Sequence, residues 1–182
     1  MKCNNKLLIS EFVGIIIIIA LGFLFHELYE ISGNNTIVGL FAPVNESKWE
    51  HWKIAFFPAL IYSIIEYPFV KDDANNFIFS KAISILTFFL VTFGLIELYE
   101  LCIGESEFCL HITTFILGAI ISQIVSYLLI TKTKENRNLR SIGILILSVL
   151  FFIFIIFTIK PPKIEYFKDP IDGTYGIKNT YS

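Results

Sequence analysis

The chain has 182 residues, of which 55% are hydrophobic and 16% are charged, and its formal net charge is −2. Because soluble domains carry about a quarter charged residues, this composition excludes an ordinary soluble domain. The weak net charge, with no stripe of Lys and Arg among aromatic residues, argues against a nucleic-acid partner. Apolar runs of about 20 residues instead indicate helices that cross a lipid bilayer.

Five apolar runs predict an all-α integral membrane protein, a bundle of five transmembrane helices forming one membrane domain over residues 1–182. The expected helices cover residues 7–28, 54–70, 77–99, 108–130 and 141–159, and a polar tail follows at 160–182. The first run is longer than the apolar core of a cleaved signal peptide, about 7–15 residues, so we expect it to be retained. Glu11 lies near its Lys-bearing end, where we expect it to reach the membrane interface.

The segment at residues 29–53, between the first two runs, is unusually polar for this chain. Its residues 32–35 read SGNN, which is typical of a turn because Gly and Asn tolerate positive φ. Residues 37–44 are apolar, and we expect them to lie in the interface or to enter the membrane as a re-entrant segment. Irregular backbone at that depth needs protein cover or a water-filled cavity.

A helix start is predicted at the end of this segment. Ser47-x-x-Glu50 matches a capping box, and Asn45 is an alternative cap one turn earlier. Trp49 and Trp52 follow, and tryptophan is enriched at membrane interfaces, where one side of the ring can remain wet.

The positive charges in the loops predict the orientation of the chain. Residues 131–140 contain both arginines and two lysines, whereas residues 101–107 contain neither. Because Lys and Arg are enriched in cytoplasmic loops, we expect a protein of the cytoplasmic membrane with its N-terminus inside and its C-terminus outside.

With five spans, that orientation gathers the ionisable residues on the outer side. The three histidines, His26, His51 and His111, all fall there, together with 11 of the 16 carboxylates. An ionisable group at the centre of a membrane helix costs at least ~2.5 kcal/mol, and such groups usually face a bundle interior or a wet cavity. We therefore expect one polar site that opens outward.

The histidines suggest a metal site. His26 and Glu30 are four residues apart and share a helix face, and His51 and His111 are candidates to complete the ligand set. Histidine and carboxylate ligands together suit zinc or another divalent metal. The alternatives are interfacial or structural hydrogen bonding, and a proton relay. The motif is not HExxH, because position 30 is Glu, which argues against a metalloprotease.

Other polar residues of the segment have two interpretations each. Glu46 and Glu50 are candidates for a catalytic acid and base, but a carboxylate at a helix N-terminus is also stabilising without any chemistry, the simpler interpretation for Glu50. Asn45, Trp49 and Lys53 are candidates for ligand binding. For Trp49 the alternative is anchoring at the interface, and for Lys53 it is an ion pair with Glu50.

Two further pairs carry open alternatives. Glu66 and Gln123 lie toward the inner half of the membrane, where they indicate either a polar pair of a transporter or one interhelical hydrogen bond. Cys102 and Cys109 flank the turn between the third and fourth helices, where they either form a disulfide or act as small apolar fillers.

The segments GLFAPVNESKWEHWK at residues 39–53, HELYE at 26–30 and FKDPIDGTYGI at 167–177 resemble a family of small bacterial multi-pass membrane proteins that is catalogued only as a domain of unknown function. The similarity covers nearly the whole chain, and PVNESxWEH and FxDPxxGTYGI are its signatures. The resemblance implies a compact bundle with signature residues at 45–47 and 49–51, and it carries no activity. It also implies an acid at position 111, where this chain has His111.

These patterns support three functions. The first is a metal-assisted, membrane-embedded hydrolase of a lipid or another amphiphile; the second is a small transporter or ligand-binding module using the same cavity; the third is a structural or partner-binding bundle. A transporter needs a polar path that continues inward, which an apolar plug would interrupt. We expect the tail to fold over residues 26–53, because both are on the outer side.

Overall fold

The computed structural model of the protein describes residues 5–104 and 107–177. In these residues, five long helices run along the same axis: α1 (Asn5–Ile31), α3 (Lys48–Val70), α4 (Phe77–Ile103), α5 (Phe108–Lys132) and α6 (Arg137–Ile159). Each is long and apolar enough to cross a membrane. The predicted all-α fold with five membrane-spanning helices is confirmed. The last part of the predicted tail, residues 178–182, lies outside the described residues.

The second long helix begins six residues earlier than the apolar run at 54–70. Ser47 caps α3, because its Oγ accepts a hydrogen bond from the backbone N–H of Glu50 at 3.3 Å. Between α1 and α3 the chain forms a single helical turn, α2 (Thr36–Gly39), which Asn35 caps. The placement of residues 37–44 in or at the membrane stays a prediction.

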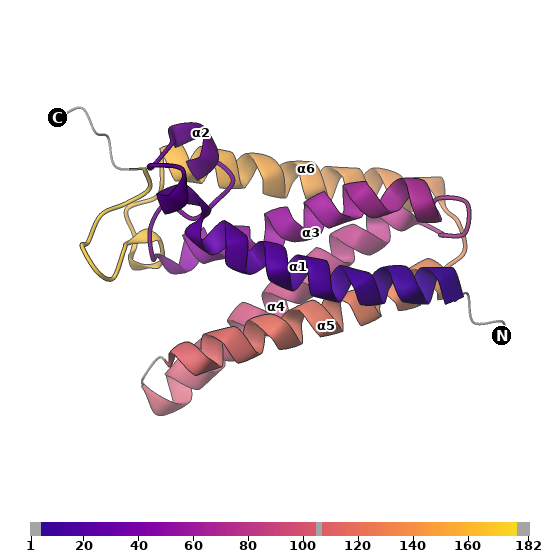
Figure 1. The fold of residues 1–182 in the computed structure, drawn as a ribbon, viewed down its shortest axis with the longest axis horizontal. Coiled ribbons are helices and arrows are strands. Elements are labelled where there is room, and N and C mark those ends of the chain that lie inside the picture. The colour runs from indigo at the N-terminus through magenta and orange to yellow at the C-terminus, as the bar shows by residue number, and fades with distance from the viewer. Residues whose placement is uncertain (1–4, 105–106, 178–182) are drawn as a thin grey trace.

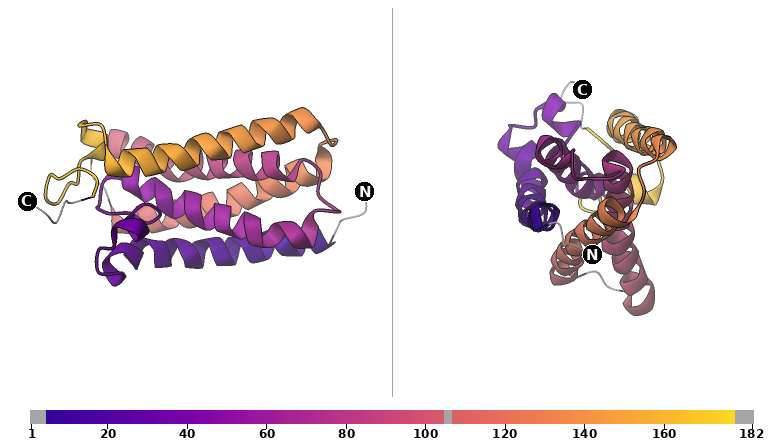
Figure 2. Two further views of the ribbon diagram at one scale, coloured as in Figure 1. Left: turned by 90° about the horizontal axis from the view of Figure 1, so that it is seen from above. Right: turned by 90° about the vertical axis from the view of Figure 1, so that its right-hand side faces the viewer.

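The arrangement of the helices places the two ends of the chain far apart. Figures 1 and 2 show that the N-terminus lies at one end of the bundle, whereas α2 and the tail lie at the other. Helix α1 packs against α3 and α5, α4 packs against α5, and α6 packs against α4. At the tail end, the tip of the α4–α5 hairpin diverges from the other helices (Figure 1).

The centre of the bundle is built from aromatic and branched side chains. Phe56, Phe88, Ile18 and Ile85 are at most 1% exposed, and Phe56 and Phe88 belong to one continuous core with Phe154. Many other large apolar residues point outward, which suits a surface that faces lipid.

Two glycines allow the helices to approach closely. A Cβ atom at Gly143 of α6 would lie 2.6 Å from the backbone of Phe79 in α4, so α6 could not pack there with a larger residue. A Cβ atom at Gly22 of α1 would lie 2.3 Å from the ring of Phe115 in α5. Glycine at these positions therefore sets the spacing of α6 against α4 and of α1 against α5.

The tail folds over the start of α3. The indole Nε1–H of Trp52 donates to the hydroxyl of Tyr166 at 2.9 Å, and the rings of Trp49 and Phe167 stack with centroids 4.8 Å apart. Both tail residues lie in a short 3-10 helix, η1 (Glu165–Phe167). The prediction that the tail folds over residues 26–53 is thus confirmed.

Candidate metal centre

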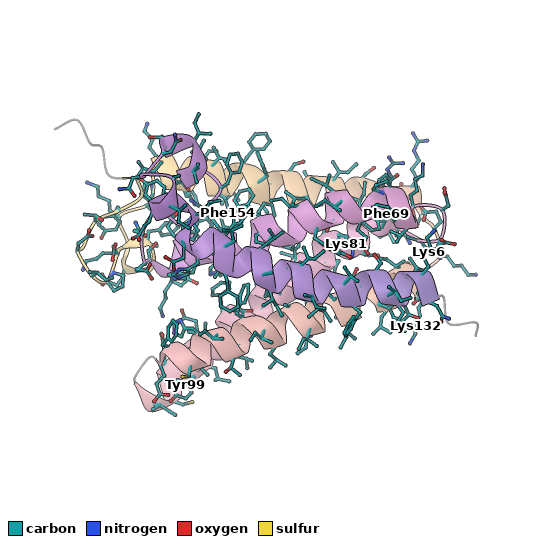
Figure 3. All side chains as sticks on the ribbon, in the orientation of Figure 1. Lys6, Phe69, Lys81, Tyr99, Lys132 and Phe154 are labelled. Carbon is teal, nitrogen blue, oxygen red and sulfur yellow. The ribbon has the colours of Figure 1, made fainter. Side chains whose placement is uncertain are left out.

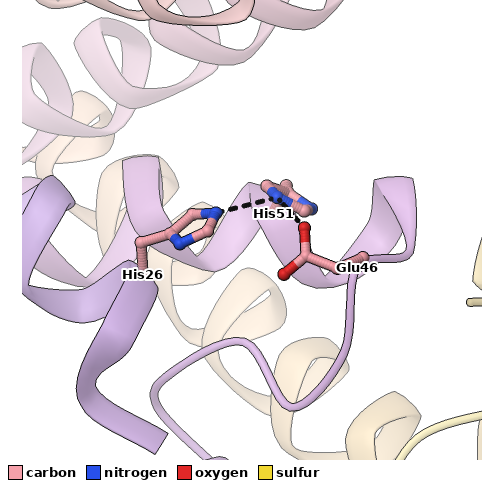
Figure 4. Close-up of side chains that lie close together, drawn as sticks. All are labelled: His26, Glu46 and His51. Atoms are coloured by element: carbon pink, nitrogen blue, oxygen red, sulfur yellow. Dashed lines mark hydrogen bonds and ion pairs between the residues drawn. The ribbon is translucent and has the colours of Figure 1, made fainter. Parts of the chain in front are cut away.

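Three side chains from three consecutive segments meet at the tail end of the bundle (Figure 4). His26 lies in the last two turns of α1, Glu46 in the loop before α3, and His51 in the first turn of α3. The cap at Ser47 fixes the direction of α3, and therefore sets where His51 points relative to α1. The loop of residues 40–47 then brings Glu46 against His51.

The ligand atoms of these side chains are close together. Nε2 of His51 lies 3.2 Å from Nε2 of His26 and 3.4 Å from Oε2 of Glu46. One such atom from each residue lies within 4.8 Å of the other two. At zinc–nitrogen and zinc–oxygen bonds of about 2.0–2.1 Å, tetrahedral geometry places two ligand atoms about 3.3 Å apart. Two measured separations match that spacing.

The second ring nitrogen of each histidine is already engaged. Nδ1 of His26 lies 2.8 Å from Oε1 of Glu27, and Nδ1 of His51 lies 3.0 Å from the carbonyl oxygen of Ser47. A carboxylate and a carbonyl only accept hydrogen bonds, so both Nδ1 atoms carry hydrogen. In the neutral rings, each Nε2 therefore presents a lone pair to the other.

Three acceptors that face one another need a cation between them. That cation is either a proton on a ring nitrogen or a metal ion. Metal-bound histidines almost always donate their other N–H to a carboxylate or a backbone carbonyl, as both rings do here. Two imidazoles and one carboxylate form a ligand set found in catalytic zinc sites, where water takes the fourth position.

The group is half exposed at the bundle end, so a fourth ligand can reach it. The side chains of His26, Glu46 and His51 are 32%, 45% and 21% exposed. When His51 carries a proton on both ring nitrogens, its hydrogen bond lowers the pKa of Glu46 below its ordinary value, and the charges of His51 and His26 add to this effect against partial burial. Glu46 is therefore ionised, as a metal ligand must be.

The other predicted metal ligands lie outside this group of three. Glu30 is exposed and does not pair with His26 one turn before it, since His26 contacts its neighbour Glu27 instead. His111 of α5 lines the same two cavities as His51, so the structure brings all three histidines to one region. Glu46, a candidate for the acid or base, lies beside His26 and His51 where Glu30 was expected.

Glu50 and Lys53 form a buried pair that holds the loop in place. Their charged atoms are 2.6 Å apart, with side chains at most 2% exposed. Lys53 Nζ also donates to the carbonyl oxygens of Gly39 and Ala42 at 2.8 and 3.2 Å. The ion pair predicted for Lys53 is confirmed, and these contacts are structural, which disfavours the catalytic role for Glu50 and the ligand-binding role for Lys53.

Asn45 and the tryptophans also serve the packing of this end. The Asn45 side chain accepts from the backbone N–H of Ser47 at 3.0 Å and donates to Gly176 of the tail at 3.4 Å. Trp49 and Trp52 stack on each other with centroids 5.9 Å apart, and Trp49 also contacts Phe154 of the core. The tail covers part of both rings, and the placement of the tryptophans at the membrane interface stays a prediction.

Three cavities adjoin the three side chains of His26, Glu46 and His51, which we call the metal group. The loop cavity, of about 360 Å³, is bordered by His26, Glu46, the loops and the tail, and it is polar. The α1–α5 cavity, also about 360 Å³, and the α4 cavity, about 300 Å³, are mainly apolar. Both apolar cavities reach Glu46, His51, Ile54, His111 and Phe115. The group thus lies where polar and apolar spaces meet.

A second polar cluster lies in the other half of the bundle, and sequence reasoning did not assemble it. Glu11 is buried and its carboxylate lies 2.9 Å from Lys81 Nζ through both oxygens, so its expected position at the interface is wrong. Glu66 also pairs with Lys81, at 2.6 Å, whereas Gln123 donates to the backbone oxygen of Glu11 at 3.5 Å. The predicted pairing of Glu66 with Gln123 is therefore wrong. The sequence feature that could have indicated this cluster is Lys81, because it is a cation inside an apolar run, as Glu11 and Glu66 are acids inside theirs.

The cysteines at the α4–α5 turn are free. Cys102 and Cys109 are both exposed and form no disulfide in the structure. Because the hairpin tip diverges from the bundle, neither thiol fills a packed space, and the interpretation of small apolar fillers is also wrong.

The fold and this group define the class: a polytopic helical membrane protein with a His/Glu group at one end of its bundle. Within that class, the chain belongs to the Family of unknown function (DUF6512), whose model matches residues 1–177. The resemblance to a family without assigned activity is confirmed. Searches of the curated proteins and of the solved structures gave no match.

Proposed function

We propose that His26, Glu46 and His51 bind one divalent transition metal, with zinc as the best fit, and that this site hydrolyses an amphiphilic substrate at the membrane surface. The observation that carries the proposal is the convergence of three acceptor atoms at 3.2 and 3.4 Å, with both histidines held by hydrogen bonds at their other nitrogen. We place the site on the extracytoplasmic face of the cytoplasmic membrane, as the loop charges favour.

The cavities support an amphiphile as the substrate. A polar head group fits the loop cavity, and a hydrocarbon chain fits the α1–α5 cavity, which Phe23, Ile112 and Phe115 line. The metal group adjoins both, so the bond between head and chain lies over it. Cavities of about 300–1,000 Å³ with apolar walls and a few convergent polar groups are typical of sites for small molecules.

The charge of the loop cavity limits the kinds of head group that can bind there. Its lining includes Glu30, Glu46, Asp169 and Asp172, and no Lys or Arg from the described part of the chain. Such a wall repels a phosphate and attracts a cationic or hydroxyl-rich neutral group. The substrate class is therefore an ester or amide with a neutral or cationic head.

The chemistry is a hydrolysis without change of oxidation state. A bound divalent metal lowers the pKa of a water molecule to about 7 and so supplies a nucleophile at neutral pH. The oxygen of that water bonds to the acyl carbon, the bond from this carbon to the leaving oxygen or nitrogen breaks, and one proton of the water moves to the leaving group. His111 borders both apolar cavities beside His51, which suits the role of carrying that proton.

The interior of the bundle favours hydrolysis over transport. Between the metal group and the second polar cluster lies the aromatic core, in which Ile18, Phe56 and Phe88 are at most 1% exposed. A transporter needs a polar path through this layer, and these residues form an apolar plug instead. The metal group at the bundle end therefore supports hydrolysis more strongly than the buried polar residues support transport.

The proposal is tested by metal content and by esterase activity of the full chain purified in detergent. Wild-type protein should hold about one zinc per chain and should cleave p-nitrophenyl decanoate faster than p-nitrophenyl acetate. His51→Ala should lose both the zinc and the activity. His111→Ala should keep the zinc and lose activity by about 100-fold or more, the usual contribution of a catalytic acid or base.

Glu30→Gln is the matched control, because Glu30 lies one turn from His26 without contacting it in the structure. It should retain the zinc, and so controls for the loss of a nearby carboxylate that is not a ligand. Zinc content that is absent in wild type, or unchanged in His51→Ala, would refute the metal site. Bound zinc without cleavage of the longer ester would refute the hydrolase while leaving the metal site standing.

A further inference from the structure

The second polar cluster consists of Glu11 from α1, Glu66 from α3 and Lys81 from α4. All three side chains are at most 4% exposed. In Figure 3, Lys81 lies in the half of the bundle near Lys6, away from Phe154 at the tail end. Glu11 is six residues, about 9 Å, from the start of α1, and Lys81 is four residues, about 6 Å, from the start of α4. The cluster is thus inside the apolar part of the bundle, on the side opposite the metal group.

The contacts within the cluster distinguish the two carboxylates. Glu11 accepts hydrogen bonds from Lys81 Nζ at 2.9 Å through each oxygen, and its Oε1 also accepts from Ser126 Oγ at 2.7 Å. Glu66 Oε1 accepts from Ser10 Oγ at 2.6 Å. Glu66 Oε2 lies 2.6 Å from Lys81 Nζ but receives no hydrogen bond from the described residues.

The charges of the cluster do not balance. Two carboxylates and one ammonium group give a net charge of −1 if all three are ionised. Among residues 5–104 and 107–177, the contacts described for the remaining neighbours bring no further charge: α3 adds Tyr62, whose hydroxyl contacts Ser10, and α5 adds the uncharged Ser126 and Gln123. A buried net charge is strongly unfavourable, and two carboxylates that share a site are not both ionised unless enough cations face them.

We propose that Glu11, Glu66 and Lys81 form a proton-binding site in which the two carboxylates together hold one exchangeable proton at neutral pH. Lys81 Nζ lies within 2.9 Å of both carboxylates, so one ammonium group faces the pair. Each carboxylate has one serine partner, Ser126 or Ser10, and because a serine hydroxyl can donate or accept, both contacts can persist whichever carboxylate carries the proton. No bond other than this O–H bond forms or breaks.

The position of the site determines which solution it exchanges with. The exposed ion pair of Lys6 and Asp73, 2.8 Å apart, marks the end of the bundle beyond the cluster. The aromatic core separates the cluster from the opposite end. The proton therefore exchanges with the solution on the N-terminal side, which gives the bundle a proton site independent of the metal group.

Infrared spectroscopy of the full chain in lipid nanodiscs tests this site, because a protonated carboxyl absorbs apart from a carboxylate and shifts in heavy water. Wild type at neutral pH should show one buried protonated carboxyl. Glu66→Gln and Glu11→Gln should each show none, since one carboxylate then balances Lys81. Lys81→Met should show two. Glu97→Gln, at an exposed carboxylate, should leave the wild-type band unchanged.

Three outcomes would overturn the proposal. The first is a wild-type spectrum without a buried protonated carboxyl at neutral pH. The second is a band that persists in both Glu66→Gln and Glu11→Gln, because the proton would then be elsewhere. If the wild-type band is absent in sodium or potassium chloride and present in the chloride of a large organic cation, the ligand is a metal cation and the proton assignment is wrong. The wild-type measurement decides even where a variant fails to fold, and no outcome depends on zinc.

Discussion

The two polar groups of this bundle differ in exposure and in how their charges are matched. At the tail end, His26, Glu46 and His51 are partly exposed and, when both histidines are neutral, present acceptors to one another without a donor between them. In the other half, Glu11, Glu66 and Lys81 are buried, and an ammonium group already lies between the two acids. The first group needs a cation from outside, whereas the second carries its own and lacks only one proton.

The difference shows that one end of the bundle is suited to bind a ligand, whereas the charges inside the other half are matched by the chain itself. An exposed group whose members are all acceptors is suited to bind a cation, because the cation replaces water molecules and breaks no contact within the group. A buried group must be nearly neutral, since the apolar surroundings do not solvate a net charge. The predictions below are therefore ordered by how much unmatched charge each substitution leaves, and so by the expected loss of stability.

The largest loss of stability is expected for Lys81→Met. This change removes the cation that faces two buried acids, and breaking such a group costs about 3–5 kcal/mol. Glu66→Gln should cost far less, under about 1.5 kcal/mol, because it removes the unmatched charge and keeps an amide that can bond to Ser10. The free energy of unfolding in detergent measures both. Equal losses for the two variants would contradict the account of the charge balance.

A smaller but still large effect is expected for Lys53→Met. The variant leaves Glu50 and two loop carbonyls without their buried partner, which should cost about 3 kcal/mol. Because the same loop carries Glu46, zinc affinity should fall as well. Lys48→Met is the control: Lys48 pairs with acids at an exposed position, and its loss should cost less than about 1 kcal/mol. Unchanged zinc affinity in Lys53→Met would show that zinc binding does not depend on how Lys53 holds this loop.

The smallest effect concerns Glu46 in the metal-free protein. Its pKa is lowered in the folded state, mainly by the hydrogen bond from His51, so its stabilising contribution is present above the ordinary value of 4.5 and is lost as the pH falls through the lowered pKa. The advantage of wild type over Glu46→Gln should thus be present at about pH 5 and shrink as the pH falls below about 4.

Because Glu46 is 45% exposed, the full contribution should be below about 1 kcal/mol. Thermal unfolding of both proteins with a chelator, across this pH range, measures it. An advantage that grows as the pH falls would mean that the pKa of Glu46 is raised rather than lowered.

Composition and local patterns were enough to predict the membrane fold. The five apolar runs are long and free of charges in their centres, so each one indicates its own helix. The cap at Ser47 and the pair of Glu50 with Lys53 follow from helical spacing alone. The placement of His26 and His51 at one end could also be expected, because both flank the loop between the first two spans.

What sequence spacing could not provide was the rotation of one helix against another. Spacing within α1 favoured Glu30 as the partner of His26, but the loop delivered Glu46, whose position depends on how Lys53 holds that loop. The same limit hid Lys81, since its contact with Glu11 and Glu66 depends on how α1, α3 and α4 face each other.

The most direct test of the central claim is X-ray absorption at the zinc edge, with the zinc-loaded full chain in detergent. The account predicts one zinc per chain with nitrogen and oxygen ligands at about 2.0–2.1 Å, two of them imidazoles, and no sulfur. The imidazole signal should fall by half in His26→Ala and in His51→Ala, if zinc is retained at all. A zinc bound by sulfur, or by oxygen atoms alone, would contradict the site formed by His26, Glu46 and His51.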